Sequence, residues 1–516
     1  MLYRRLVYPI AAVIAFSLPL ANAQTQAPFA YEVVPYSATC PTTGVVGCQA
    51  PGYVPAVFTY NGAASTIPNA DLKNPANFGQ SFPISILTSE LNASIATALT
   101  VIPIASPASA VITRTDPTTG AELPVSSTLG PILTERAETI GKHRFFVGFA
   151  NQDFHFTSLN GQSLHRLRLL DPGGQPTGLL SGTNQALTTY PATVGIGVDV
   201  HLGQNVAFFT YGLTDRVDVS VGLPIVHASI SSQTSNTQIY AGDGFGGSSS
   251  SNPNCWCLDT LTPASAPGKN LNLNGLVQPG VLNSANKSST GFGDMLVRAK
   301  GTLIRRRNLA FAVGADLRLP TGDEKNFLGT GATAIKPFLA LSLYTTPLAH
   351  GIVFSPHFNV GWQFSGKSLL GGLLAPTQVT AGPPPFFAQP FNSTKDYLPD
   401  VFSWAVGSEI AFGSHNTVAF DILGNQIGLV HGIANVTSAQ SQGFLPAVGC
   451  GATCQQVTVS GLVGAGRVSF GEYNGAFGYK AKIVSNLVFT FNLLVRFDNT
   501  GLTARTTPLF GLGYTF

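Results

Sequence analysis

The sequence predicts an all-β protein: a transmembrane antiparallel up-and-down β-barrel of about 12 strands, with an N-terminal plug or extension. Three observations predict it. A secretory leader is followed by no stretch of about 18 uninterrupted apolar residues; many strands have one apolar face; and long and short connections alternate along the chain. Because only helices and closed barrels satisfy every backbone hydrogen bond within lipid, a membrane protein without an apolar helix has to be a barrel.

The leader is predicted as a signal peptide over residues 1–23. A basic start at Arg4 and Arg5 precedes an apolar run from Leu6 to Leu20, and small residues 21–23 form a cleavage site. The run is too short for a membrane anchor, so we expect the mature chain to begin near Gln24. Charged residues make up only 10% of the chain, and the net charge of +3 indicates no nucleic-acid partner.

The last ten residues are predicted to form the closing strand. Pro508, Phe510, Leu512, Tyr514 and Phe516 share one side of an extended chain, while small residues occupy the other. A C-terminal strand of a soluble all-β domain is the alternative. A strand that ends the chain on an aromatic residue is typical of outer-membrane barrels, whose last strand pairs with the first. Phe516 is then expected at the periplasmic rim, as a signal read by the outer-membrane assembly machinery.

Twelve candidate strands can be marked from residue 142 onward. They cover 142–157, 195–212, 216–232, 290–305, 308–321, 332–346, 350–365, 399–413, 415–428, 469–484, 486–498 and 503–516. In the stretch 352–364, Phe354, Phe358 and Trp362 belong to an apolar set, and His357 belongs to the alternating polar or small set. We expect the first set to face lipid and the second to face the lumen.

The connections alternate in length. Those after odd-numbered strands are long (158–194, 233–289, 322–331, 366–398 and 429–468), except for the last, near 498–502; those after even-numbered strands are short (213–215, 305–307, 346–349, 414 and 485). Short periplasmic turns and long external loops are the rule in outer-membrane barrels. The sequence therefore predicts the outer membrane of a Gram-negative bacterium, with its lipid as a partner.

Residues 24–140 fit no strand pairing and are rich in Pro, Ala and Thr. Leu87, Leu91, Ile95 and Leu99 are spaced four apart and predict a short amphipathic helix. Two interpretations remain: a plug inside the lumen, or an extension in the periplasm. The segment carries little charge, which favours the plug. The predicted organisation is therefore a signal peptide (1–23), a plug or extension (24–140) and a barrel (141–516).

The six cysteines form three local pairs in an exported chain, which predicts disulfide bonds. The pairs are Cys40 with Cys48, Cys255 with Cys257, and Cys450 with Cys454. The second pair would be strained and could instead link to another loop. Metal binding is the rival interpretation, but no histidine or carboxylate cluster accompanies any pair at zinc-like spacing.

Charged side chains of both signs fall on the predicted inward faces. The candidate lumen-lining residues are Asp218, Asp294, Arg298, Lys300, Asp316, Arg318, Lys336, His357, Glu409, Asp421, Arg496 and Asp498. A charge inside a barrel has to be paired or hydrated. Two interpretations follow: a polar conduit with electrostatic selectivity, or a ladder of ion pairs that fills the interior.

Several short motifs carry a resemblance to a known family. They are residues 211–218, 291–294 (GFGD), 319–323 (LPTGD), 328–331 (LGTG), 501–502 and 508–516. Over about 194–516 the chain resembles outer-membrane proteins of the "putative meta-pathway of phenol degradation" family, relatives of the long-chain fatty acid and toluene transporters. The resemblance implies passive uptake of a small hydrophobic substrate, aromatic or acyl, through a plugged barrel. The long N-terminal segment departs from the short hatch of the fatty acid transporters. The motifs at 319–331 fit either a glycine-containing turn or a lid over a substrate entrance.

Other functions remain as alternatives. A general small-solute porin or a structural outer-membrane protein would share the barrel pattern. An outer-membrane hydrolase would need a nucleophile beside a base, and Ser355 and His357 lie on one predicted face. No Gly-x-Ser-x-Gly elbow, P-loop or dinucleotide fingerprint occurs in a suitable context. The sequence therefore predicts no enzyme, no cofactor and no metal site.

Overall fold

The computed structural model describes most of the barrel and parts of the N-terminal region. The described residues are 84–102, 129, 133–171, 192–242, 284–306, 308–345, 352–372, 395–413, 415–439, 459–484 and 486–516, with short strands between them at 48–49, 59–60, 113–115, 122–124, 178–179, 186–187, 258–260, 374–376 and 391–393. The predicted signal peptide and five cysteines lie outside these residues, and only the backbone of Cys48 lies within them. The signal peptide and the disulfide bonds therefore stay predictions.

Twelve strands form the barrel wall. They are β5 (Phe145–Phe156), β11 (Ala192–Thr214), β12 (Val217–Gly242), β15 (Met295–Arg305), β16 (Leu309–Leu319), β17 (Ala334–Leu343), β18 (Ile352–Ser365), β23 (Val401–Phe412), β24 (Asn416–Ala439), β25 (Val459–Val484), β26 (Leu487–Arg496) and β28 (Thr506–Thr515). Neighbours in this order pair antiparallel, and β28 pairs with β5 from Leu509↔Gln152 to Thr515↔Phe146. The closed 12-stranded antiparallel barrel predicted from the sequence is confirmed.

The remaining described elements are short, apart from one helix. They are β1 (Cys48–Gln49), β2 (Thr59–Tyr60), α3 (Ile84–Val101), β3 (Thr113–Thr115), β4 (Glu122–Pro124), β6 (Ser158–Leu159), β7 (Gln162–Ser163), η3 (Leu164–Arg166), β8 (Leu167–Asp171), β9 (Gly178–Leu179), β10 (Ala186–Leu187), β13 (Leu258–Thr260), β14 (Ser284–Phe292), η5 (Glu324–Asn326), β19 (Lys367–Ser368), β20 (Leu374–Pro376), β21 (Phe391–Ser393), β22 (Asp396–Tyr397) and β27 (Leu502–Thr503). Among the described residues, no helix combines the length and the apolar character needed to cross a membrane.

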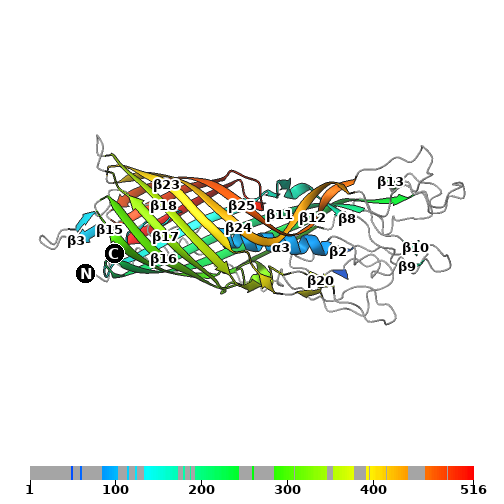
Figure 1. Ribbon diagram of the computed structural model, residues 1–516, viewed down its shortest axis with the longest axis horizontal. Coiled ribbons are helices and arrows are strands. Elements are labelled where there is room, and N and C mark those ends of the chain that lie inside the picture. The colour runs from blue at the N-terminus through cyan, green and yellow to red at the C-terminus, as the bar shows by residue number, and fades with distance from the viewer. Residues whose placement is uncertain are drawn as a thin grey trace.

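The two ends of the barrel differ as the connection lengths predict. Short turns join β11 to β12, β15 to β16, β23 to β24 and β25 to β26 at the end where the C-terminus lies (Figure 1). Long hairpins project from the other end. β11 and β12 pair as far as Ala192↔Ile239, and β24 and β25 pair as far as Ala439↔Val459. The short-turn end is the periplasmic end of an outer-membrane barrel.

Three strands extend well beyond their predicted ranges. β12 and β25 have 26 residues each and β24 has 24, against the predicted 216–232, 469–484 and 415–428. Beyond residue 232 the sequence of β12 is polar on both faces, so it lacks the alternation that marks a membrane strand. The predicted strand 290–305 is also interrupted, since Gly293 and Asp294 separate β14 from β15.

The barrel exterior is apolar. Phe354, Phe358 and Trp362 are 37%, 41% and 50% exposed on β18, and the rings of Trp362 and Phe402 contact one another edge-on. On the other face of β18, Ser355 and His357 are buried. This pattern confirms the lipid-facing set predicted for β18. A closed barrel with such an exterior lies in the outer membrane of a Gram-negative bacterium.

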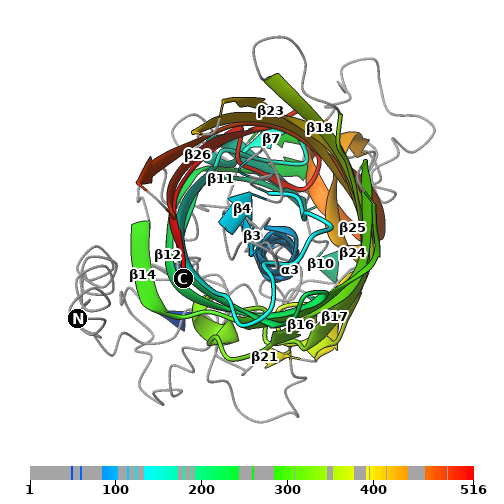
Figure 2. The same cartoon turned by 90° about the vertical axis from the view of Figure 1, so that its left-hand side faces the viewer.

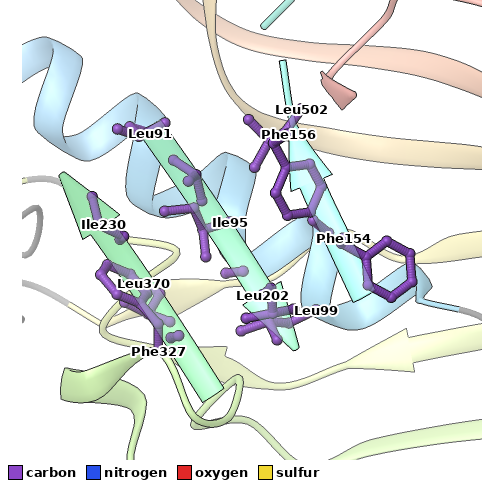
Figure 3. Close-up of a cluster of buried hydrophobic side chains, with 14 of the residues drawn as sticks. Leu91, Ile95, Leu99, Phe154, Phe156, Leu202, Ile230, Phe327, Leu370 and Leu502 are labelled. Carbon is purple, nitrogen blue, oxygen red and sulfur yellow. The ribbon is translucent and has the colours of Figure 1, made fainter. Parts of the chain in front are cut away.

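The helix predicted around Leu91 is confirmed as α3, and it lies inside the barrel (Figures 1 and 2). Leu91, Ile95 and Leu99 face residues of the surrounding strands, including Leu202 and Ile230 (Figure 3). The helix is not amphipathic in its burial, because almost every residue from 91 to 100 is buried. The hydroxyl groups of Thr97 and Thr100 instead donate to the carbonyl oxygens of Ala93 and Ala96.

The apolar cluster around α3 predicts a local stability effect. Leu91 is fully buried, and replacing it with alanine leaves a cavity that costs about 2–5 kcal/mol. We expect L91A to lose hydrogen-exchange protection in α3 while the wall strands keep theirs. L429A is the control, because Leu429 is 59% exposed on β24. Unchanged protection of α3 in L91A would show that this cluster does not hold the helix.

Candidate functional site: the occupied lumen

Residues 133–140, here called the inner segment, cross the lumen near its periplasmic end and lead into β5. Their polar backbone atoms bond to the barrel wall. Ile140 N donates to Asp218 Oδ2 at 2.8 Å, and Ala137 N donates to Ser342 Oγ at 3.1 Å. Thr302 Oγ1 donates to the carbonyl oxygen of Ala137 at 2.6 Å. The inner segment is therefore bound to β12, β15 and β17 through side chains that point into the lumen.

Glu135 is the most heavily bonded side chain of the inner segment. Its carboxylate accepts a hydrogen bond from Arg298 and another from Lys300 at 2.7 Å. The Lys300 ammonium also donates to the carbonyl oxygens of Arg136 and Glu138, at 3.0 and 2.7 Å. On β18, three strands away from β15, Asn359 Oδ1 accepts from Glu135 N at 2.6 Å and Asn359 Nδ2 donates to Glu135 O at 2.8 Å.

A second group of wall charges holds the neighbouring residues. Arg136 pairs with Glu409 at 3.2 Å, and both side chains are buried. His357 Nε2 lies 2.6 Å from Asp421 Oδ1 and 2.8 Å from the Thr134 hydroxyl. These bonds tie the inner segment to β18, β23 and β24. Just before it, Leu129 N donates to Thr417 Oγ1 and its carbonyl oxygen accepts from Lys480.

The second layer of the interior is α3, which lies in the lumen on the external side of the inner segment. Arg318 donates to the carbonyl oxygens of Leu99 and Thr100, at 2.7 and 3.3 Å. These carbonyls belong to the last turn of the helix, where unpaired acceptors and the negative end of the helix dipole favour a cation. Arg318 thereby binds the C-terminal end of α3 to β16.

A cavity of about 160 Å³ lies between the two layers. Residues 100–102 at the end of α3 line it on one side, and Leu133, Thr134 and Glu135 line it on the other. The wall contributes apolar residues such as Phe338 and amides such as Gln363. The cavity also contacts the charged residues Arg298, Asp316, Arg318 and Lys336.

Three of the motifs that carried the family resemblance, at 291–294, 319–323 and 328–331, meet at the outer part of the wall. Asp294 Oδ2 accepts from Thr330 N at 2.7 Å and from the Thr330 hydroxyl at 2.6 Å, while Oδ1 accepts from Gly322 N at 3.1 Å. Gly331 has a φ of +69°, which favours glycine. The loop places Phe327 in the cluster around α3. The geometry favours the turn interpretation of residues 319–331, with Asp294 as its anchor.

Arg496 and Asp498 lie at the outer end of β26. Arg496 contacts Glu472 and Asp498, each at 3.0 Å. Asp498 belongs to the connection after β26, because that strand ends at Arg496 and not at the predicted 498. Burial alone would raise the pKa of the Asp498 carboxyl. Hydrogen bonds from Arg496, Tyr473 N and Thr500 outweigh it and hold this pKa below its ordinary value.

The structure sorts the sequence-predicted lumen charges by their contacts. Asp218, Arg298, Lys300, His357, Glu409 and Asp421 contact the inner segment; Asp316, Arg318 and Lys336 line the cavity; Asp294 anchors a loop; Arg496 and Asp498 pair at the outer end. Their role in solute selection stays a prediction. Pairs between wall strands occur, as between Arg298 and Asp316, but many of the bonds go to the inner segment.

Glu135 and Arg136 organise this site but are not among the residues predicted from the sequence. They lie in a region without strand alternation, so no face could be assigned to them. The available signal was the charge cluster Glu135-Arg136 and Glu138 within a sparsely charged stretch immediately before the first barrel strand.

One family model matches part of this chain. The family model described as "Putative MetA-pathway of phenol degradation" matches residues 182–383, which include the GFGD and LPTGD motifs, so the resemblance predicted from them is confirmed. No curated protein matches the sequence.

Solved structures similar to this chain are outer-membrane proteins. One is the COG4313 outer membrane channel from Pseudomonas putida F1, with 10% identity, a TM-score of 0.37, and coverage of 74% of this chain and 98% of that one. A Pseudomonas aeruginosa FadL homologue has 10% identity, a TM-score of 0.26, and coverage of 72% and 89%. The Ralstonia pickettii toluene transporter TbuX has 10% identity, a TM-score of 0.27, and coverage of 73% and 90%. The closed antiparallel barrel with its apolar exterior is that of an outer-membrane protein, and its residues 182–383 match the phenol-degradation family model.

Proposed function

We propose that this protein is an outer-membrane channel for passive uptake of small hydrophobic compounds, aromatic or acyl. The observation that carries the proposal is the layered interior: apolar α3 fills the outer half of the lumen, and the polar inner segment crosses the periplasmic half. A continuous water-filled pore is what a general porin needs, and these two layers argue against one. An apolar solute can instead pass along the apolar side chains around α3 and reach the cavity between α3 and the inner segment.

The family model and the names of similar proteins support the same class of solute. TbuX is a toluene transporter, and CymD is a monoaromatic hydrocarbon channel. Residues 24–140 act as the plug in this proposal, held by the wall charges that contact Glu135 and Arg136. The partners are outer-membrane lipid, the small hydrophobic solute and, during biogenesis, the outer-membrane assembly machinery.

The hydrolase alternative finds little support at its candidate residues. Ser355 Oγ donates to the carbonyl oxygen of Leu343 at 2.8 Å. His357 instead lies beside Asp421 and Thr134, beneath the inner segment. A nucleophile has to be activated by its base and reached by its substrate, and this pair meets neither condition. We therefore propose a transport function without catalysis.

Transport can be tested in an outer-membrane strain that lacks its own hydrophobic-compound channels. Expression of the protein should increase the initial rate of labelled toluene uptake at least about threefold without increasing uptake of a hydrophilic sugar, because the described interior offers apolar contacts around α3 and is crossed by the inner segment. Equal acceleration of both solutes would identify a general porin. Acceleration of neither, with normal barrel levels, would contradict the proposed function.

A further inference from the structure

The cavity between α3 and the inner segment has a mixed lining that a pure hydrocarbon would not use. Leu133, Leu296, Phe338 and Leu494 provide apolar contacts, and Asn359 and Gln363 are among the amides on its wall. A cavity of about 150 Å³ can hold a benzene molecule, so about 160 Å³ is enough for one aromatic ring or a short acyl chain.

The charges around the cavity do not balance. Its lining contains Arg298, Arg318 and Lys336 against the carboxylates of Asp316 and Glu135. Arg298 bonds both oxygens of Asp316, at 2.6 and 2.8 Å, and also contacts Glu135. Glu135 is shared further with Lys300. Asp316 is therefore already paired with Arg298, and Glu135 with Arg298 and Lys300.

Lys336 is the cation of the cavity lining that remains without a hydrogen-bond acceptor among the described residues. Arg318 is satisfied by the carbonyl oxygens at the end of α3. Lys336 lies opposite Asp316 in the strand register, yet its ammonium makes no hydrogen bond or ion pair with any described residue. An ammonium enclosed without an acceptor is unfavourable, and an anionic partner relieves that cost.

The neighbouring strand leaves room for this lysine. A Cβ at Gly361 would lie 2.8 Å from Lys336 Cε and 3.1 Å from the carbonyl oxygen of Pro337. The aliphatic part of Lys336 therefore passes over Gly361 on β18. Phe338, two residues further along β17, stands on the same face, with its ring 5.2 Å from the Arg298 guanidinium. An aromatic surface and a cation thus sit side by side in the cavity wall.

We propose that this cavity is a binding site for a small organic acid, with Lys336 receiving the carboxylate and the apolar wall receiving one aromatic ring or a short acyl chain. The inference rests on the proposed function, because it names a class of solute that the proposed channel would bind inside its lumen. Hydrogen bonds to a charged group contribute about 1.5–3 kcal/mol, so the carboxylate contact should change affinity by about 10-fold or more.

Binding can be measured by titration calorimetry on the purified full-length protein in detergent, with benzoate and its neutral isostere benzamide. Wild-type protein should bind benzoate at least about 10-fold more tightly than benzamide. K336Q should remove this preference and leave benzamide binding unchanged, while K336R should retain part of it. K142Q is the matched control, because Lys142 is exposed near the periplasmic end, away from the cavity lining.

Equal affinities of the wild-type protein for benzoate and benzamide would overturn the proposal, and this measurement does not depend on any variant folding. A benzoate preference that survives in K336Q would also overturn it. The test is separate from toluene uptake: failed uptake with a Lys336-dependent benzoate preference would contradict the proposed function alone, and normal uptake without that preference would contradict this site alone.

Discussion

Replacing Glu135 with glutamine should open the barrel to ions. Glu135 is the carboxylate that Arg298 and Lys300 share, and all three side chains are largely enclosed. Removing one member of a buried charge group costs about 3–5 kcal/mol because the remaining charges lose their partner. The wall itself is held by its strand ladder, so we expect this cost to displace the inner segment. In planar bilayers the wild-type protein should be mostly closed, and E135Q should show frequent conducting events.

Glu138 provides a matched control three residues along the same segment. Glu138 is also buried, but its Oε2 has no hydrogen-bond partner among the described residues. E138Q removes a charge that is poorly compensated, so it should leave the bilayer recordings close to wild type. If E135Q stays as closed as the wild type, or if both variants open equally, the Glu135 contacts are not what holds the inner segment in place.

Deleting Phe516 should reduce the amount of assembled barrel in the outer membrane several-fold. Phe516 N donates to Phe145 O at 2.8 Å, and its ring contacts those of Phe145 and Tyr514. The deletion shortens the seam where β28 meets β5 and removes the aromatic end expected to be read by the assembly machinery. Heat-modifiable gel mobility of outer-membrane fractions would measure the folded barrel directly.

F412A is the control for this deletion. Phe412 is another exposed aromatic residue at the periplasmic end, but it ends β23, far from the seam. Its loss should leave barrel levels near normal, since it affects lipid contacts alone. Normal barrel levels after deletion of Phe516 would contradict its assignment as the closing signal.

Much of the fold could be predicted because lipid imposes a strict pattern on the wall. In β18, Phe354, Phe358 and Trp362 alternate with Ser355 and His357, and this period reveals both the strand and its orientation. The pattern ends where lipid ends. The outer parts of β12 and β25 are held by pairing with a neighbouring strand in water, which requires no apolar face, so their length could not be predicted.

Only the residues that the barrel wall contributes to the site could be predicted. The alternation of side chains along each strand placed Lys300, His357 and Glu409 on the lumen side. It does not show which residues a charged side chain contacts. Each of these three residues contacts the inner segment, which has no repeating pattern and takes its conformation from the wall around it. The surplus charge on Lys336 likewise became apparent only once the pairs of Arg298 and Arg318 were known.

The position of the inner segment also sets an order of events during biogenesis. The segment immediately precedes β5, and β5 is the strand to which β28 pairs when the ring closes. A peptide bonded to five or more strands of a finished ring would have to break many of those bonds to enter it later. The wall is therefore expected to form around the inner segment, and pairing of β28 with β5 would enclose that segment. In this scheme folding yields a barrel that already contains the inner segment. A barrel without it would arise only if the segment were later pulled out of the lumen.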